Sequence, residues 1–212
     1  MLLLTHPRSG SEWFLSSLPN IKYSGIEFGG LSYLLTPQLM EIDKEITIFK
    51  YRTLVRSHKV FFSYLDFRKK TNPDKWDELV AAINKRDDLY LLSRRNCREA
   101  ILSFYIGYNN NNNFHNSTST LTTKFLISKA GLATYFDLVY SKKEWVKQLF
   151  SFKEEFFYED LVNGTQTPQT LTYDPSISTV QPRNSSEYYN LIQNFDEVIS
   201  WMDELGVPGT IA

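Results

Sequence analysis

Ten residues near the start of the chain have the composition of an anion-binding loop. The run Leu2–Leu4 is apolar enough to form a buried strand, and the polar, small-residue stretch Thr5–Phe14 follows it directly. Where a strand turns at once into a helix, backbone N–H groups of the turn and of the first helical residues point at one spot and bind phosphate or sulfate. Arg8 would add a positive charge and a planar set of donors to this site.

The loop differs from the phosphate loop of kinases and ATPases. It lacks the first glycine and the Gly-Lys-Ser/Thr ending of that pattern, so a kinase is not the first interpretation. The alternative to an anion-binding loop is an ordinary strand-to-helix turn, in which the proline and glycine only shape the backbone and nothing is bound. The residues expected to contact a bound anion or nucleotide are Pro7, Arg8, Ser9, Gly10, Ser11, Glu12 and Trp13.

A second candidate anion site follows another apolar run. Leu89–Leu92 predicts a buried strand, and an arginine-rich turn then leads into an amphipathic helix over about 99–108. Arg95 at the strand end and Ser103 in the helix would face the same ligand and hold a second phosphate. A solvated cluster of charges is the alternative interpretation.

The segment Arg56-Ser57-His58 lies between the two candidate sites. Histidine has a near-neutral pKa, which suits a general base that removes a proton from an acceptor hydroxyl or amine. His58 is therefore the candidate base, with a histidine of no chemical consequence as the alternative. If His58 is not the general base, a carboxylate such as Glu27 or Asp66 would take that role.

These motifs, in this order, resemble those of the sulfotransferase family. The string from Pro7 to Trp13 resembles Pro-Lys-Ser-Gly-Thr-Thr-Trp, the family's 5′-phosphosulfate loop, and the segment ending at His58 resembles its Lys-Thr-His. Arg95 and Ser103 have the spacing of the family's 3′-phosphate motif.

Two weaker matches lie further along the chain. Tyr158-Glu159-Asp160 resembles a strand-end Tyr-Glu-Asp whose tyrosine lies near the adenine. Arg183 stands where the family has an Arg-Lys-Gly loop over the 3′-phosphate, but the lysine and glycine are missing here.

The resemblance implies a fold, a reaction and a set of roles. The fold is a single α/β domain over residues 1–212, with a central, mainly parallel sheet flanked by helices, as in phosphate-loop proteins. The reaction is sulfuryl transfer from 3′-phosphoadenosine 5′-phosphosulfate (PAPS) to a hydroxyl or amine, which leaves adenosine 3′,5′-bisphosphate (PAP). His58 would act as the base, Arg8 would stabilise the leaving phosphate and Arg56 would assist. Trp13 would stack on adenine.

Two other functions stay open at this stage. One is a protein that binds PAPS or PAP without catalysis, and the other is a small-molecule kinase, which the missing loop residues disfavour. The acceptor would be a small molecule, a glycan or a peptide, and a homodimer is left open.

Composition excludes several other classes of protein. The chain has 212 residues and a formal net charge of −1, whereas a protein that binds nucleic acid through its backbone carries a positive excess. Its single cysteine, Cys97, and the lack of a Cys/His cluster indicate chemistry without a metal. No segment approaches the roughly 20 apolar residues of a membrane span, so a cytoplasmic location is expected.

The remaining pattern predicts the elements between the motifs. We expect helices over about 12–18, 72–86, 124–150 and 187–205, and a strand over 46–49. The asparagine-rich stretch 109–121 predicts a flexible loop.

Overall fold

The computed structural model describes residues 1–20, 22–28, 42–50, 56–110, 121–178, 180 and 185–211. Within these ranges the chain forms a five-stranded sheet whose neighbouring strands are all parallel. In chain order the strands are β1 (Leu2–Thr5), β2 (Lys22–Phe28), β3 (Arg56–Phe61), β4 (Leu89–Ser93) and β5 (Glu154–Phe157). Their order in the sheet is β2-β3-β1-β4-β5. The predicted α/β class with a parallel central sheet is therefore confirmed.

The central position of β1 explains its uninterrupted apolar sequence. Leu2 and Leu4 pack into a core that includes α4 (Phe62–Thr71) and α5 (Trp76–Asn84), whereas Leu3 packs into a core on the opposite face with α1 (Ser11–Ser16). All three leucines are fully buried. A parallel strand covered on both faces has no solvent-facing positions, so alternation of polar residues is not needed.

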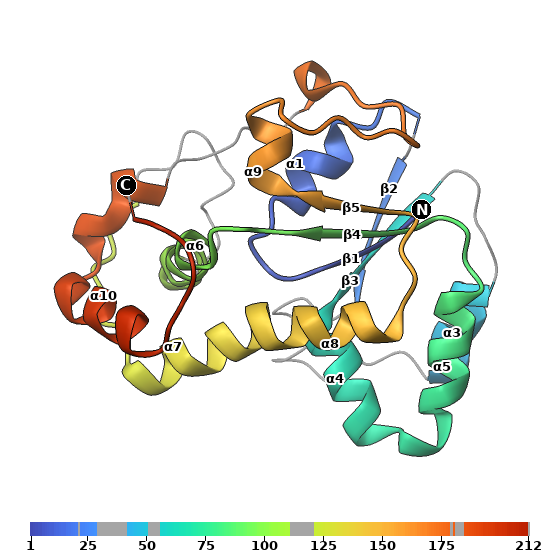
Figure 1. Ribbon diagram of the computed structural model, residues 1–212, viewed down its shortest axis with the longest axis horizontal. Helices are drawn as coiled ribbons and strands as arrows, with labels where there is room; N and C mark the ends of the chain where they lie inside the picture. The colour runs from blue at the N-terminus through green and yellow to red at the C-terminus, as the bar shows by residue number, and fades with distance from the viewer. Residues whose placement is uncertain are drawn as a thin grey trace.

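Helices cover both faces of the sheet (Figure 1). The short helices α1 and α9 (Tyr158–Val162) lie on one side, and α4 and α8 (Lys142–Leu149) lie on the other. α3 (Ile42–Lys50), the 3₁₀ turn η1 (Pro73–Lys75) and α5 complete that second side. The predicted helix over 72–86 corresponds to η1 and α5, and the predicted helix over 12–18 corresponds to α1.

A second group of helices lies beyond the carboxyl ends of the strands (Figure 1). It contains α6 (Cys97–Asn109), α7 (Lys129–Phe136), the 3₁₀ turn η5 (Ser185–Leu191) and α10 (Phe195–Glu204), which share one apolar core. Between α7 and α8 the helix continues through a π-helical segment, η3 (Asp137–Ser141). A further 3₁₀ turn, η4 (Pro175–Ile177), follows α9. This group places helix side chains directly against the loops that leave the sheet.

Three predicted elements are corrected by the structure. Residues 46–49 lie in helix α3 and not in a strand, because Ile42, Ile46 and Phe49 recur at helical spacing and are all buried. The helix expected from residue 124 begins at Lys129, where the Ser128 side chain accepts a hydrogen bond from the Gly131 N–H.

The third correction concerns the C-terminal helix. It is broken between η5 and α10, where the Asn194 side chain is hydrogen bonded to both backbone groups of Ile127. The asparagine-rich stretch lies mostly outside the described residues, since α6 reaches Asn109 and residues 111–120 are not described.

The strand order creates a switch point at β1 and β4. The chain leaves β1 toward β2 at one edge of the sheet, and it leaves β4 toward β5 at the other edge. The loops that follow two such neighbouring strands diverge, and in open α/β sheets ligands bind in the crevice that this divergence leaves. Both sequence-predicted anion loops, the one after Thr5 and the one after Ser93, are at this place.

Candidate anion-binding site

The loop between β1 and α1 has the backbone of an anion-binding turn. Arg8 has φ of 62° and Gly10 has φ of 79°, so two of three successive residues are left-handed. Turns of this kind direct successive N–H groups into a common concavity. Gly10 is the residue that precedes α1, where glycine tolerates the left-handed conformation, but Arg8 adopts it at a cost. Because α1 has only six residues, the loop amides contribute more here than the helix dipole does.

The Arg8 side chain turns from the loop onto α6. A Cβ placed on Gly107 would lie 1.9 Å from Arg8 Nη2 and 2.6 Å from Arg8 Cζ, so the guanidinium lies directly against the glycine backbone. Burial lowers the pKa of the Arg8 guanidinium, while Tyr135 and Glu12 act in the opposite direction. Arginine stays protonated in proteins, so the loop carries a half-buried positive charge.

Ser103 shares this face of α6 with the glycine that Arg8 contacts. It precedes Gly107 by four residues, which places both on one side of the helix, and it is buried. The structure therefore brings together Arg8 and the Ser103 face of α6, a combination that the sequence motifs did not predict.

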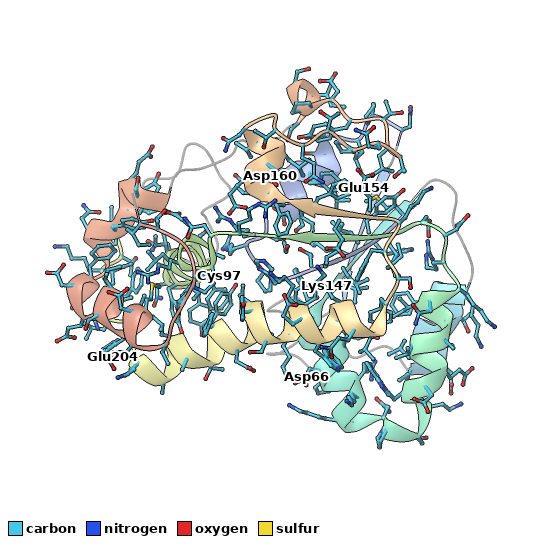
Figure 2. All side chains as sticks on the ribbon, in the orientation of Figure 1. Asp66, Cys97, Lys147, Glu154, Asp160 and Glu204 are labelled. Carbon is cyan, nitrogen blue, oxygen red and sulfur yellow. The ribbon has the colours of Figure 1, made fainter. Side chains whose placement is uncertain are left out.

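Arg95 lies on a different side of the site. Its guanidinium stacks 3.8 Å from the centre of the Phe157 ring and donates to Asp160 Oδ2 at 2.7 Å. Figure 2 shows Asp160 on α9, away from α6. In this conformation Arg95 is directed at β5 and α9, so the predicted pairing of Arg95 with Ser103 is not formed.

The backbone after β4 binds a carboxylate of the chain itself. Glu159 Oε2 accepts a hydrogen bond from the Arg95 N–H at 3.0 Å, and Glu159 Oε1 accepts from the Asn96 N–H and from Arg94 Nε at 3.2 Å each. Glu159 thus occupies the backbone donors of the turn that follows β4. The arginine that takes part is Arg94, which the sequence reasoning did not select.

Tyr158 joins the two loops. A Cβ on Gly10 would lie 2.1 Å from Tyr158 Cδ2, so the tyrosine ring covers the glycine, and the Arg94 guanidinium lies 4.8 Å from the centre of that ring. Tyr158 is the first residue of α9, directly after β5. The sequence predicted that Tyr158 lies near a bound nucleotide, and in the structure this tyrosine lies against the loop after β1.

Trp13 is part of the core. It is 5% exposed, and its ring meets Tyr158 and Tyr173 edge to face, with centroids 5.7 and 6.1 Å apart. Because α1 begins at Ser11, the third residue of the helix turns inward to the sheet. The prediction that Trp13 stacks on adenine is therefore not supported by its placement.

The remaining polar residues of the loop are held by the protein. Ser9 is fully buried and its hydroxyl is hydrogen bonded to that of Thr5, while Ser11 is buried at the start of α1. The Glu12 carboxylate lies 3.7 Å from the Nζ of Lys59, a buried lysine on β3. Arg183 lies outside the described residues.

His58 is distant from the loop. In the register of β1 and β3 it is opposite Leu2, three residues before β1 ends at Thr5. That offset corresponds to about 10 Å along a strand. β3 runs from Arg56 to Phe61, so His58 lies within the strand and not at the edge from which the loop leaves. Arg56, two residues earlier, is farther still from that edge, so the predicted roles of both in catalysis are not supported.

The structure does not support Asp66 or Glu27 as the general base either. Asp66 lies on α4 (Figure 2), where it pairs with Lys70 Nζ at 2.7 Å and Lys142 Nζ at 3.1 Å. Glu27 is in β2, and its side chain lies outside the described part of the structure.

Two residues that the sequence did not select contact the loop from behind. His6 Nδ1 is 2.8 Å from the Pro7 carbonyl oxygen, and the Tyr135 hydroxyl donates to the same oxygen at 3.0 Å. His6 is fully buried, which lowers the pKa of its imidazole to about 4. Since the carbonyl only accepts, the neutral ring carries its proton on Nδ1. No spacing rule would have revealed Tyr135, which is 128 residues away in the chain.

A substitution at Gly107 would test the contact between Arg8 and α6. Gly107→Ala is expected to weaken binding of inorganic phosphate about tenfold, because the added methyl group must displace the guanidinium. Stability should fall by no more than about 1–2 kcal/mol, since the preference of helices for alanine over glycine, about 1 kcal/mol, offsets part of the cost of fitting the methyl group. Calorimetry and urea unfolding measure the two effects, and unchanged affinity would show that the Arg8 position is irrelevant to binding.

In the described ranges no three His, Cys, Asp or Glu side chains are grouped so that they could bind a metal ion. Among the helices described there, none is long and apolar enough to span a membrane.

Comparisons with models of known protein families, with curated protein sequences and with solved structures found no match to the chain.

Proposed function

We propose that the chain is a sulfotransferase that takes the sulfuryl group of PAPS and transfers it to a hydroxyl or amine acceptor. The observation that carries this proposal is the half-buried Arg8 in a left-handed loop at the switch point of the sheet, against the Ser103 face of α6. The resemblance of Pro7–Trp13 to the 5′-phosphosulfate loop supplies the chemical class.

The proposed reaction depends on position and charge. The acceptor oxygen or nitrogen attacks sulfur in line, the bond between sulfur and the bridging oxygen breaks, and the 5′-phosphate of PAP leaves with the bonding electrons. Negative charge grows on that phosphate, where Arg8 and the loop amides stabilise it. The acceptor proton passes to solvent water and not to His58, because that residue lies along β3 away from the loop.

The 3′-phosphate would be held by Arg95 after an exchange of partners. The side chain of Arg95 is 59% exposed in its ion pair with Asp160. Exposed pairs of this kind contribute about 1 kcal/mol or less, so a phosphate dianion competes well with the carboxylate. Arg95 therefore fits the 3′-phosphate even though it is paired within the chain.

We expect PAP to bind at least about tenfold more tightly than AMP, because only PAP carries the phosphate that recruits Arg95. Calorimetric titration of both nucleotides measures this difference. Arg95→Gln should remove the preference and leave AMP binding unchanged. Equal affinities in the wild-type protein would contradict the assignment, and tight magnesium-dependent ATP binding would favour a kinase.

The catalytic part of the proposal needs a transfer assay. Radiolabelled PAPS would be incubated with a panel of phenols, alcohols, amines, glycans and tyrosine peptides, and labelled product or released PAP would be measured. Binding of PAP without transfer to any acceptor would leave a binding protein, the alternative from the sequence.

A further inference from the structure

The carbonyl group of Pro7 is fixed by two donors from different parts of the fold. It accepts a hydrogen bond from His6 Nδ1 at 2.8 Å and another from the Tyr135 hydroxyl at 3.0 Å. A carbonyl oxygen has two lone pairs, so both are engaged. The direction of this carbonyl is thereby determined by one residue of the loop and one residue of α7.

Both donors are themselves held rigidly. The Tyr135 ring stacks on Phe104 of α6 with centroids 4.0 Å apart and is 4% exposed. The His6 ring is fully buried, and its centroid is 5.9 Å from that of Phe62 at the start of α4. Rigid packing means that neither donor can follow the carbonyl if the peptide rotates.

The direction of the Pro7 carbonyl also fixes the Arg8 N–H. The peptide bonds of the described residues include no cis bond, and in a planar trans peptide the C=O and the following N–H point in opposite directions. The Arg8 N–H therefore points away from His6 and Tyr135. Rotation of this peptide by half a turn would replace the N–H by a carbonyl oxygen, which repels an anion.

The unusual backbone of Arg8 belongs to the same arrangement. Its φ is 62°, which costs an L-residue about 1–2 kcal/mol. Half a turn of the Pro7–Arg8 peptide would bring φ of Arg8 to about −120°, within the negative range that L-residues adopt readily. The loop is therefore held in the less favourable of two backbone states, and the two hydrogen bonds to Pro7 oppose the change to the relaxed one.

We propose that His6 and Tyr135 are positioning residues, which hold the Pro7–Arg8 peptide so that the Arg8 N–H faces the transferred group and its leaving phosphate. This inference rests on the proposed function for the identity of the anion. The positioning itself rests only on the contacts of Pro7 and on φ of Arg8.

Matched variants separate the donors from their packing. Tyr135→Phe removes the hydroxyl and keeps the ring on Phe104. His6→Leu removes the donor, whereas His6→Asn keeps an amide N–H near the place of Nδ1. Tyr105→Phe is the control, because this tyrosine lies in the same aromatic cluster but its hydroxyl is near Gly131: a Cβ there would be 2.7 Å from it.

The first measurement is spectroscopic and needs no activity. The three-bond coupling between the amide and α protons of Arg8 depends on φ, and it can be followed in protein labelled at arginine. We expect it to change to the value of extended backbone in the double variant Tyr135→Phe/His6→Leu, and to stay unchanged in Tyr105→Phe. An unchanged coupling in the double variant would overturn the inference.

The second measurement is binding of inorganic phosphate and PAP. Each single loss of a donor should weaken affinity about three- to tenfold, and His6→Asn should restore most of the loss relative to His6→Leu. The double variant should lose more than the product of the single effects, because either bond alone still holds the peptide. If the double variant does not fold, the single variants and the asparagine rescue decide the question.

The two measurements also separate this inference from the proposed function. If wild-type protein binds neither phosphate nor PAP, the proposed function fails, yet the Arg8 coupling still tests the positioning. If PAP binds to wild-type and double-variant protein equally, the function survives and the positioning role is wrong.

Discussion

Replacing Arg8 with alanine is expected to lower sulfuryl transfer by about 100- to 1000-fold, the usual effect of removing a donor aimed at developing negative charge. The guanidinium lies against Gly107 and is half-buried, so water screens its charge less than that of an exposed arginine. In the proposed reaction, charge on the leaving phosphate grows as the bond to sulfur breaks, so the loss should fall mainly on kcat, with a smaller rise in KM for PAPS.

Two further variants sharpen this experiment. Arg8→Lys keeps a positive charge but loses the planar fork, so it should recover only part of the rate. Arg98→Ala is the matched control: this arginine of α6 donates to the Val207 carbonyl at 2.9 Å and to Asp203 at 2.6 Å, on the side of the helix near α10. It should lower stability and leave transfer intact. Wild-type transfer by Arg8→Ala would place the reaction elsewhere.

The elements of the sheet could be predicted because burial on both faces leaves a clear pattern. Leu2–Leu4 and Leu89–Leu92 are continuous apolar runs, and both became central strands next to each other. Residues 46–49 show the limit of such patterns. A short apolar run fits a strand or one side of a helix equally well. In the structure this run forms a helix, because its apolar side packs against α5 in the core.

The site could be predicted only where its residues are close in sequence. The loop after β1 has the expected position and backbone, since small residues and Gly10 constrain the chain locally. A motif does not reveal the register of its strand: β3 continues for three residues after His58, which is about 10 Å along the strand, so the motif could not show how far His58 lies from the loop.

Contacts between residues far apart in the sequence determine the other parts of the candidate site. Tyr135 reaches Pro7 only because α7 packs on α6, and Glu159 fills the amides after β4 only because β5 pairs with β4. Neither residue has a sequence signature of its own. They follow from tertiary packing that no single segment encodes.

The buried His6 is expected to make the protein sensitive to mild acid. Its pKa is lowered to about 4 from 6.5 because burial disfavours the charged imidazolium, with Arg94 and Lys143 adding repulsion and Glu159 opposing it. Above about pH 6.5 the imidazole is neutral in both folded and unfolded chains, so it has no effect on the free energy of unfolding. As the pH falls from 6.5 toward 4, only the unfolded chain gains the proton.

The protein should therefore lose about 3 kcal/mol of stability over this range through His6 alone. Carboxylates with lowered pKa, such as Asp66 and Asp88, lose their contribution at lower pH, mainly below about 4, which separates the two effects. Urea unfolding of wild-type protein and of His6→Asn at pH 7.0 and 4.5 measures the difference. The variant should show a clearly smaller loss between these two pH values.

A direct titration connects this behaviour to its cause. NMR of the imidazole should show His6 uncharged down to about pH 5, and Lys143→Met should raise its pKa by removing one of the repelling charges. If wild-type protein and His6→Asn lose the same stability between pH 7.0 and 4.5, the histidine is not held neutral in the fold, although an imidazolium would still donate from Nδ1 to Pro7.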